Sequence, residues 1–225
     1  MVKNAFLHNM SFEIRTPLTT VVGFAELFQM EHTTEDEAVF IEEIKSNSAQ
    51  LLKLINDILF LSRLDADMIT INPQPVDCAS SITSRCESTW ANHKKPGVQY
   101  IVKTPFKKLV LDIDMNNIGI VLEKILNNAV QHTTQGSVLV HYDYLGDQLA
   151  VSVEDTGCGI PEDQIKHIFD RFVTDASSNG AGLGLSICQD LVQHMGGKIN
   201  LTSTVDKGTN VWFTIPCKLI EMERN

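Results

Sequence analysis

Apolar side chains recur every three or four positions through the first 60 residues, the spacing of one helix face. The first stretch predicts a helix from about Val2 to Met30, kinked at Pro17. Thr34 and Glu37 form a capping box that opens a second helix. The two apolar stripes are Phe6, Met10, Ile14, Pro17, Val21, Phe24 and Phe28, then Ile41, Ile44, Ser48, Leu51, Ile55, Ile58 and Ser62. Such wide stripes predict a helical hairpin that pairs with a second copy as a four-helix bundle.

The pattern changes after the hairpin. Two prolines in INPQPVD break the helical period and predict a linker. Beyond it, helices are expected at about 77–92, 114–132, 162–169 and 183–195, and strands at 100–103, 108–112, 137–144, 148–155, 197–203 and 210–216. Helices interspersed with these strands predict an α/β sandwich with helices on one sheet face. The expected domains are residues 1–70 for the hairpin, 71–76 for the linker and 77–220 for the sandwich.

Composition narrows the functional classes. The chain has 225 residues, 43% of them hydrophobic, and a net charge of −10. This acidic balance argues against a nucleic-acid binder, which usually has a basic face. Five scattered cysteines without a CxxC pair favour a reducing compartment and suggest neither zinc nor disulfides. No run reaches the roughly 18 apolar residues of a membrane span. We therefore expect a cytoplasmic fragment whose only membrane attachment would come from segments outside it.

Phe12 does not fit the apolar stripe of the first helix. It lies two residues from both Met10 and Ile14, so its side chain projects roughly 200° away from them. His8 and Thr16 share its side of the helix, one turn away in each direction. Because the core face is already assigned, Phe12 is expected at the surface. There it either meets a partner or replaces a residue with a chemical role.

Three segments of the second part are typical of a phosphate-binding site: ILNNAVQHT, VEDTGCGIP and NGAGLGLSI. Glycines at a helix start let backbone amides approach an anion, which the helix dipole also favours. Asp155, just before a glycine turn, suits a hydrogen bond from an exocyclic amine. Asn128 offers a neutral oxygen to a hydrated Mg²⁺ ion shared with phosphates. A single glycine cluster more often makes an ordinary turn, but three such segments together strengthen the interpretation.

These motifs resemble the catalytic core of bacterial sensor histidine kinases. FLHNMSFEIRTPL is similar to their phosphoacceptor box, and ILNNAVQHT, DTGCGI, IFDRF and GAGLGLSI are similar to the boxes of their ATP domain. The resemblance implies a dimeric two-helix hairpin, a Bergerat-type ATP domain, ATP and Mg²⁺ as cofactors, and a response-regulator receiver domain as partner. It assigns the metal to Asn128. The nucleotide contacts that it implies are Asn128, Lys124, Gln131, His132, Asp155, Gly157, Gly159, Ile160, Phe172, Gly180, Gly182, Leu183, Gly184, Leu185 and Thr209.

The chain departs from the family pattern at two places beside Asn128. Lys124 stands where the family often has asparagine, and Gln131 and His132 stand where it often has a cation followed by an aromatic residue. Loss of that cation removes a phosphate contact, which Lys124, one turn away, could restore in part. The segment VTDASSN before the last glycine motif is expected to be a lid, because its small polar residues disfavour fixed packing.

Position 12 holds the phosphoacceptor histidine in the family, so Phe12 removes the nucleophile. Phenylalanine has no nitrogen lone pair and cannot be phosphorylated. Glu13 and Thr16 match the family's carboxylate and phosphatase positions and are present. His8 is a weaker acceptor candidate, since Asn9 rather than a carboxylate follows it. Two origins of Phe12 stay open, an engineered substitution and a natural degenerate kinase.

Three functions are therefore weighed. The first is a histidine kinase core that binds ATP and Mg²⁺ but is blocked in autophosphorylation. The second is a pseudokinase scaffold or a response-regulator phosphatase that uses Glu13 and Thr16. The third is an ATPase of the gyrase and chaperone superfamily. It is disfavoured by the hairpin and by the position of Glu123, five residues rather than four before Asn128.

Overall fold

The computed structural model describes residues 2–30, 32–93, 95–173 and 181–225. The chain forms two compact units. One comprises Met1–Met68 with Arg171–Leu183, and the other comprises Ile69–Asp170 with Gly184–Asn225. None of the described helices is both long enough and apolar enough to cross a membrane.

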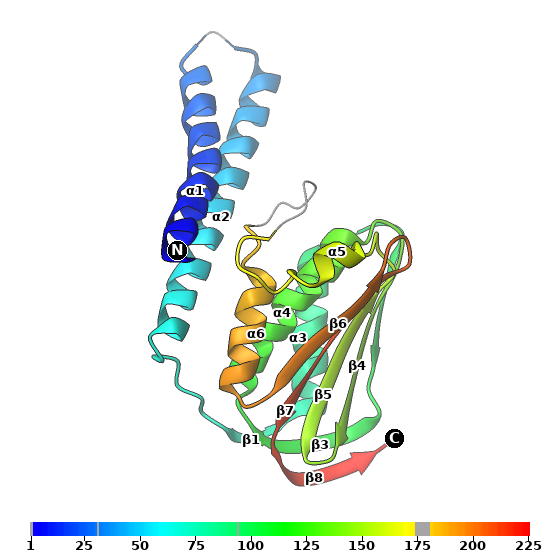
Figure 1. The fold of residues 1–225 in the computed structure, drawn as a ribbon. Coiled ribbons are helices and arrows are strands. Elements are labelled where there is room, and N and C mark those ends of the chain that lie inside the picture. Colours follow the sequence, from blue (N-terminus) through cyan, green and yellow to red (C-terminus); the bar gives the residue numbers. More distant parts are fainter. Residues whose placement is uncertain (1, 31, 94, 174–180) are drawn as a thin grey trace. The chain divides into compact units, whose positions relative to one another are not determined.

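Two antiparallel helices form most of the first unit, as predicted. They are α1 (Val2–Leu27) and α2 (Thr34–Asp65), drawn in blue and cyan in Figure 1. The predicted capping box was one residue too late: it joins Thr33 and Asp36. The Thr33 side chain accepts from the Asp36 N–H at 3.1 Å, and the Asp36 carboxylate accepts from the Thr33 N–H at 3.0 Å. Thr33 is the last residue with extended backbone, so it takes the capping position.

The packed face of α2 differs from the predicted seam. Leu54 and Leu64 are buried outside the predicted seam, whereas Ile41 and Ile55 of that seam are exposed. Leu61, which the sequence places beside the seam, is buried as expected. A single partner helix covers only one side of α2, so the second apolar stripe remains at the surface. In the same unit Arg171 donates to both carboxylate oxygens of Asp65, at 2.8 and 2.6 Å, and this bond lowers the pKa of Asp65.

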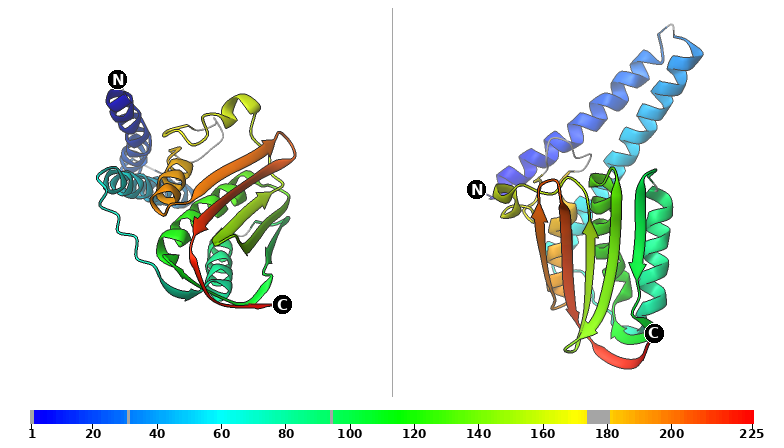
Figure 2. Two further views of the ribbon diagram at one scale, coloured as in Figure 1. Left: turned by 60° about the horizontal axis from the view of Figure 1, so that its bottom comes forward. Right: turned by 90° about the vertical axis from the view of Figure 1, so that its right-hand side faces the viewer.

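The second unit is an α/β sandwich. Its five-stranded sheet has the order β2 (Val98–Lys103), β4 (Gly136–Leu145), β5 (Gln148–Asp155), β7 (Gly208–Pro216) and β6 (Lys198–Thr204). Strands β2 and β4 are parallel, and the other neighbours are antiparallel. As Figures 1 and 2 show, one face is covered by α3 (Cys78–His93), α4 (Met115–His132) and α6 (Gly184–His194). The expected one-sided helix layer is therefore confirmed.

A small second sheet holds the end of this unit. Strand β3 (Phe106–Ile113) pairs with β1 (Gln74–Asp77) on one side and β8 (Lys218–Arg224) on the other. Strand β1 occupies part of the segment expected as a linker, and β8 was not predicted. Pro75 is tolerated in β1 because β1 is an edge strand. Helix α5 (Glu162–Ile165) is shorter than the predicted 162–169.

The core lies between the five-stranded sheet and its helices. Alternate residues of β4 and β5 face it, among them Val140, Tyr142 and Val151, all at most 1% exposed. Helix α4 contributes an apolar stripe that includes Ile118 and Ile125. This packing fixes the C-terminal end of α4 and the end of β5, the two places where the nucleotide motifs begin.

Candidate functional site

Asp155 ends β5 with a buried carboxylate that is 7% exposed. Its Oδ1 accepts the backbone N–H of Gly157 at 2.8 Å and that of Thr209 at 3.3 Å. Within the described residues Oδ2 has no protein partner, so one acceptor remains for a ligand N–H. Burial raises the pKa of Asp155, while the two backbone bonds oppose this effect. The two backbone bonds thus hold the carboxylate in place, and its second oxygen can accept a hydrogen bond from an amino group.

The loop that follows Asp155 requires glycine at two positions. A Cβ at Gly157 would collide with the carbonyl oxygen of His132, and one at Gly159 would collide with that of Thr204. Gly159 also has a φ of +69°, in the region that favours glycine. The Cys158 N–H donates to the His132 carbonyl at 3.3 Å, which fastens the loop to the end of α4.

A hydroxyl pair supports the same loop. The Oγ of Ser203 on β6 lies 2.8 Å from the Oγ1 of Thr209 on β7 and accepts the Ile160 N–H at 2.8 Å. Thr209 is buried and also donates its N–H to Asp155. The sequence indicated Ile160 and Thr209 but not Ser203. Ser203 was missed because its role depends on the strand register that pairs it with Thr209 across β6 and β7, and the local sequence does not show this register.

Asn128 lies beside the start of α6. An added Cβ at Gly184 would be 3.9 Å from both side-chain atoms of the Asn128 amide. Among the described residues no hydrogen bond engages this amide, so its oxygen fits a hydrated Mg²⁺ ion. Gly184 and Leu185 begin the 11-residue α6, and the N-terminal end of a helix of this length favours an anion such as phosphate. Lys124 is half-buried one turn before Asn128 on α4.

The hydrogen bonds of Gln131 and His132 are made by their backbone carbonyls. The Gln131 carbonyl accepts from the Lys95 amine at 2.9 Å, and the His132 carbonyl accepts from Cys158. The Gln131 side chain is exposed and that of His132 is half-buried. These carbonyl contacts do not depend on the identity of the side chain.

The remaining predicted nucleotide residues belong to the first unit. The Phe172 N–H donates to the Gly182 carbonyl at 2.9 Å. Both residues have positive φ, +65° and +64°, which is strained for phenylalanine and ordinary for glycine. Leu183 is buried. Gly180 and the predicted lid residues 174–179 lie outside the described residues.

The predicted acceptor position is at the surface of α1. Phe12 is 62% exposed, as its place off the apolar stripe predicted. Thr16, one turn later, is also exposed, and its hydroxyl donates to the Phe12 carbonyl at 3.3 Å. Glu13 is half-buried. The structure thus presents an aromatic ring and a hydroxyl on one exposed face of the helix.

Both parts of the chain match known families. Residues 2–67 match the His Kinase A (phospho-acceptor) domain, and residues 113–219 match the histidine kinase-, DNA gyrase B- and HSP90-like ATPases. A hairpin of the first kind joined to an ATPase domain of the second kind is the architecture of a histidine protein kinase.

Individual relatives agree with these matches. The chain is 33% identical over 230 residues to the sensor histidine kinase WalK of Bacillus subtilis, covering 96% of this chain and 37% of WalK. It is 35% identical to the hybrid signal transduction protein dokA of Dictyostelium discoideum, covering 95% of this chain and 14% of dokA. A crystal structure of full-length ShkA in complex with AMPPNP is similar, with a TM-score of 0.68 and 28% identity, covering 97% of this chain and 46% of ShkA. The chain belongs to the histidine kinases and carries their catalytic core. It spans well under two thirds of these relatives.

Proposed function

We propose that this chain is the ATP- and Mg²⁺-binding core of a two-component sensor in which autophosphorylation is blocked at Phe12. Asp155 would accept the adenine amino group through Oδ2, and Asn128 would hold Mg²⁺ beside the start of α6. Phe172, Gly182 and Leu183 would complete the nucleotide contacts by family resemblance. The crystal structure of the related ShkA in complex with AMPPNP supports the proposal that this chain binds ATP.

The observation that carries the proposal is the exposed ring of Phe12 at the acceptor position. A histidine at this place would present its imidazole to solvent, where a γ-phosphate can reach it. In a parent with that histidine, the phosphoryl group would move from ATP to the imidazole nitrogen and then to an aspartate of a response regulator. A phenyl ring has no lone pair for the first step.

Labelled ATP tests the block directly. The unaltered chain, Phe12→His and Phe12→Ala would be incubated with γ-labelled ATP and Mg²⁺. Acid-labile label is expected on Phe12→His alone. Label on the unaltered chain would contradict the proposal, and its loss in His8→Ala would identify the neighbouring histidine as the acceptor.

A dedicated phosphatase is the second candidate. Thr16 remains exposed on the face of Phe12, and its 3.3 Å bond to a carbonyl is long enough to be exchanged for a water. Its hydroxyl would then orient that water against the aspartyl phosphate of a receiver domain. Thr16→Ala should lower the dephosphorylation rate of a phosphorylated receiver domain at least tenfold. Thr20→Ala is the matched control, because Thr20 makes the same bond to Thr16. Equal rates in both variants would contradict this function.

The hairpin is proposed to dimerise. Leu52 is 63% exposed, and Leu59, Ile55 and Val22 are also exposed, although all are apolar. A second copy would bury these residues in a four-helix bundle. Under the same proposal the domains are residues 1–70, 71–76 and 77–220. The chain is then the cytoplasmic part of a sensor anchored in the inner membrane by segments outside it.

A further inference from the structure

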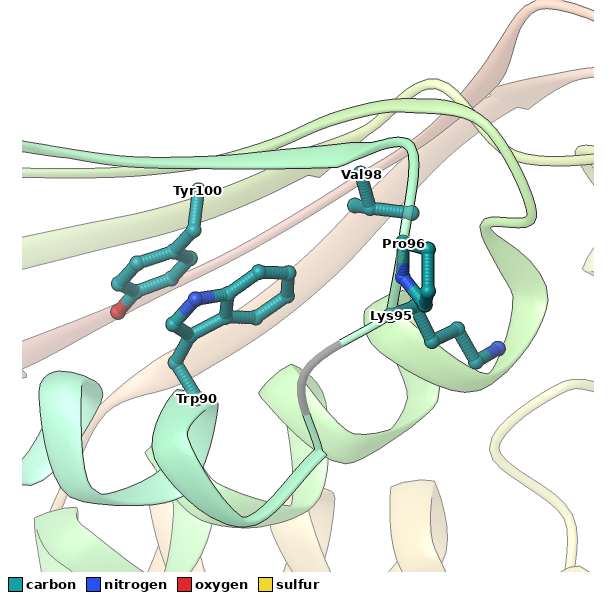
Figure 3. A pocket seen from close by; sticks show the side chains of 5 residues that line it. All are labelled: Trp90, Lys95, Pro96, Val98 and Tyr100. Atoms are coloured by element: carbon teal, nitrogen blue, oxygen red, sulfur yellow. The ribbon is translucent and has the colours of Figure 1, made fainter.

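A pocket of about 420 Å³ lies at the edge of the sandwich, between α3 and the start of β2. Its volume is within the range of roughly 300–1,000 Å³ that is usual for small-molecule sites. Five residues line it: Trp90, Lys95, Pro96, Val98 and Tyr100. Figure 3 shows the Trp90 ring between the Tyr100 ring on one side and Val98, Pro96 and Lys95 on the other.

The side chains that line the pocket favour a ligand with a flat aromatic ring. Trp90 and Tyr100 are stacked, with ring centroids 5.0 Å apart and planes 10° from parallel. This stack occupies one face of the indole, and Figure 3 shows Pro96 and Val98 beside the Trp90 ring on the side away from Tyr100. An aromatic ligand placed there would extend the stack and contact the proline and valine side chains. The Tyr100 hydroxyl lies at the buried end of the pocket wall, and burial raises its pKa, so it stays protonated.

Lys95 adds a positive charge to this apolar site. Its amine donates to the carbonyls of Val130, Gln131 and Thr133, at 2.6, 2.9 and 3.4 Å. In the described part of the chain no carboxylate lies within ion-pair distance of it, so the charge is balanced only by neutral carbonyls at the C-terminal end of α4. The longest of these bonds is the easiest to exchange for an anionic ligand.

The same carbonyls connect the pocket to the nucleotide site. Gln131 and Thr133 flank His132, whose carbonyl accepts the Cys158 N–H in the loop after Asp155. An anion that draws the Lys95 amine away would loosen this turn of α4. The loosened turn would in turn shift the loop that positions Asp155.

We infer that this pocket is an allosteric site for a small aromatic carboxylate. The ring stacks on the free face of Trp90, and the carboxylate replaces the Thr133 carbonyl at the Lys95 amine. Binding then disturbs the His132–Cys158 contact. Binding in the pocket does not depend on nucleotide, whereas its allosteric role rests on the proposed nucleotide site at Asp155.

NMR titration of the full chain tests the site. Phenylacetate would be compared with phenylacetamide, its neutral counterpart, by following the indole N–H of Trp90. Trp212, on the uncovered face of the sheet, serves as the internal reference. We expect a saturable shift of Trp90 alone, with phenylacetate binding about five times more tightly than the amide because of the charged hydrogen bond. Equal affinities, or no saturable shift of Trp90, would overturn the inference.

Variants separate the ring and charge contributions. Lys95→Met keeps the length of the side chain and should remove the preference for the carboxylate. Lys95→Arg should keep it. Trp90→Leu should abolish binding of both compounds. The comparison of acid and amide on the unaltered chain remains decisive if a variant is unstable.

The coupling has its own readout. In the unaltered chain the backbone amide of Cys158 should shift with the same midpoint as Trp90 during the phenylacetate titration, without any nucleotide present. Phenylacetamide should leave this amide in place. A saturated pocket with an unmoved Cys158 amide would refute the allosteric part of the inference.

Discussion

Replacing Asp155 by asparagine should change one hydrogen-bond acceptor of the side chain into a donor while preserving the loop. The asparagine oxygen can still accept the N–H groups of Gly157 and Thr209, which both bind Oδ1 in the structure. The second oxygen becomes an NH₂ donor. It would then face the amino group of adenine, which is also a donor. The fold should persist while adenine recognition fails.

The magnitude follows from the bond that is lost. A hydrogen bond to a charged acceptor contributes about 1.5–3 kcal/mol. Its removal should weaken ATP·Mg²⁺ binding about 10- to 150-fold. Inosine triphosphate carries an oxygen instead of the amino group and should bind the variant no more weakly than it binds the unaltered chain. Calorimetric titration with the two nucleotides measures both effects.

Stability provides an independent check with a defined sign. Burial raises the pKa of Asp155 above 3.8, so the native state keeps this proton to higher pH than the unfolded chain. The contribution of Asp155 to stability therefore falls as pH rises from 3.8 through the folded-state pKa. The substituted asparagine side chain cannot ionise, so the stability of Asp155→Asn relative to the unaltered chain should rise over this window and then level off. The reasoning would be refuted if the variant bound ATP and inosine triphosphate with equally reduced affinity, or if its affinity for ATP fell by less than about threefold.

Three further outcomes are expected. Gly159→Ala should lower the free energy of unfolding by about 1–3 kcal/mol, because Gly159 has a φ of +69° and an added Cβ would collide with the Thr204 carbonyl. Chemical denaturation measures this change, and an unchanged free energy of unfolding would contradict the loop geometry. Leu54→Ala should destabilise the hairpin by about 2–5 kcal/mol, seen as a lower midpoint of helix melting. Leu52→Glu should leave the helix content unchanged but convert the proposed dimer into a monomer in light scattering, and a persistent dimer would exclude this face.

Most of the helices and the surface position of Phe12 on α1 could be predicted because they depend on local periodicity. The spacing of Met10, Phe12 and Ile14 was sufficient to place Phe12 at the surface. Strand β8 was missed because its residues are mostly exposed and show little alternation. The choice between Leu54 and Ile55 as the packed residue of α2 depends on the partner helix, which the stripe alone does not specify.

Within the site, sequence motifs indicated residues whose neighbours are close in the chain. Asp155 and Gly157 are two positions apart and bond directly. Ser203 was missed because its role comes from strand pairing with Thr209, and nothing near Ser203 in the sequence marks it. Lys95 was missed for the same reason, since its carbonyl partners lie 35 or more positions away.

In the proposed function, Phe12 and Asp155 are each held by their own set of hydrogen bonds. Among the bonds that position Asp155, each donor comes from the loop after β5 or from β7. On α1, the Thr16 hydroxyl donates to the Phe12 carbonyl and not to its ring. If the parent carries histidine at this position, as proposed, exchange of the ring removes a nucleophile without removing any of these hydrogen bonds between described residues. Loss of phosphate acceptance should then leave ATP binding and the Thr16 hydroxyl intact, which is the combination required of a sensor confined to its phosphatase state.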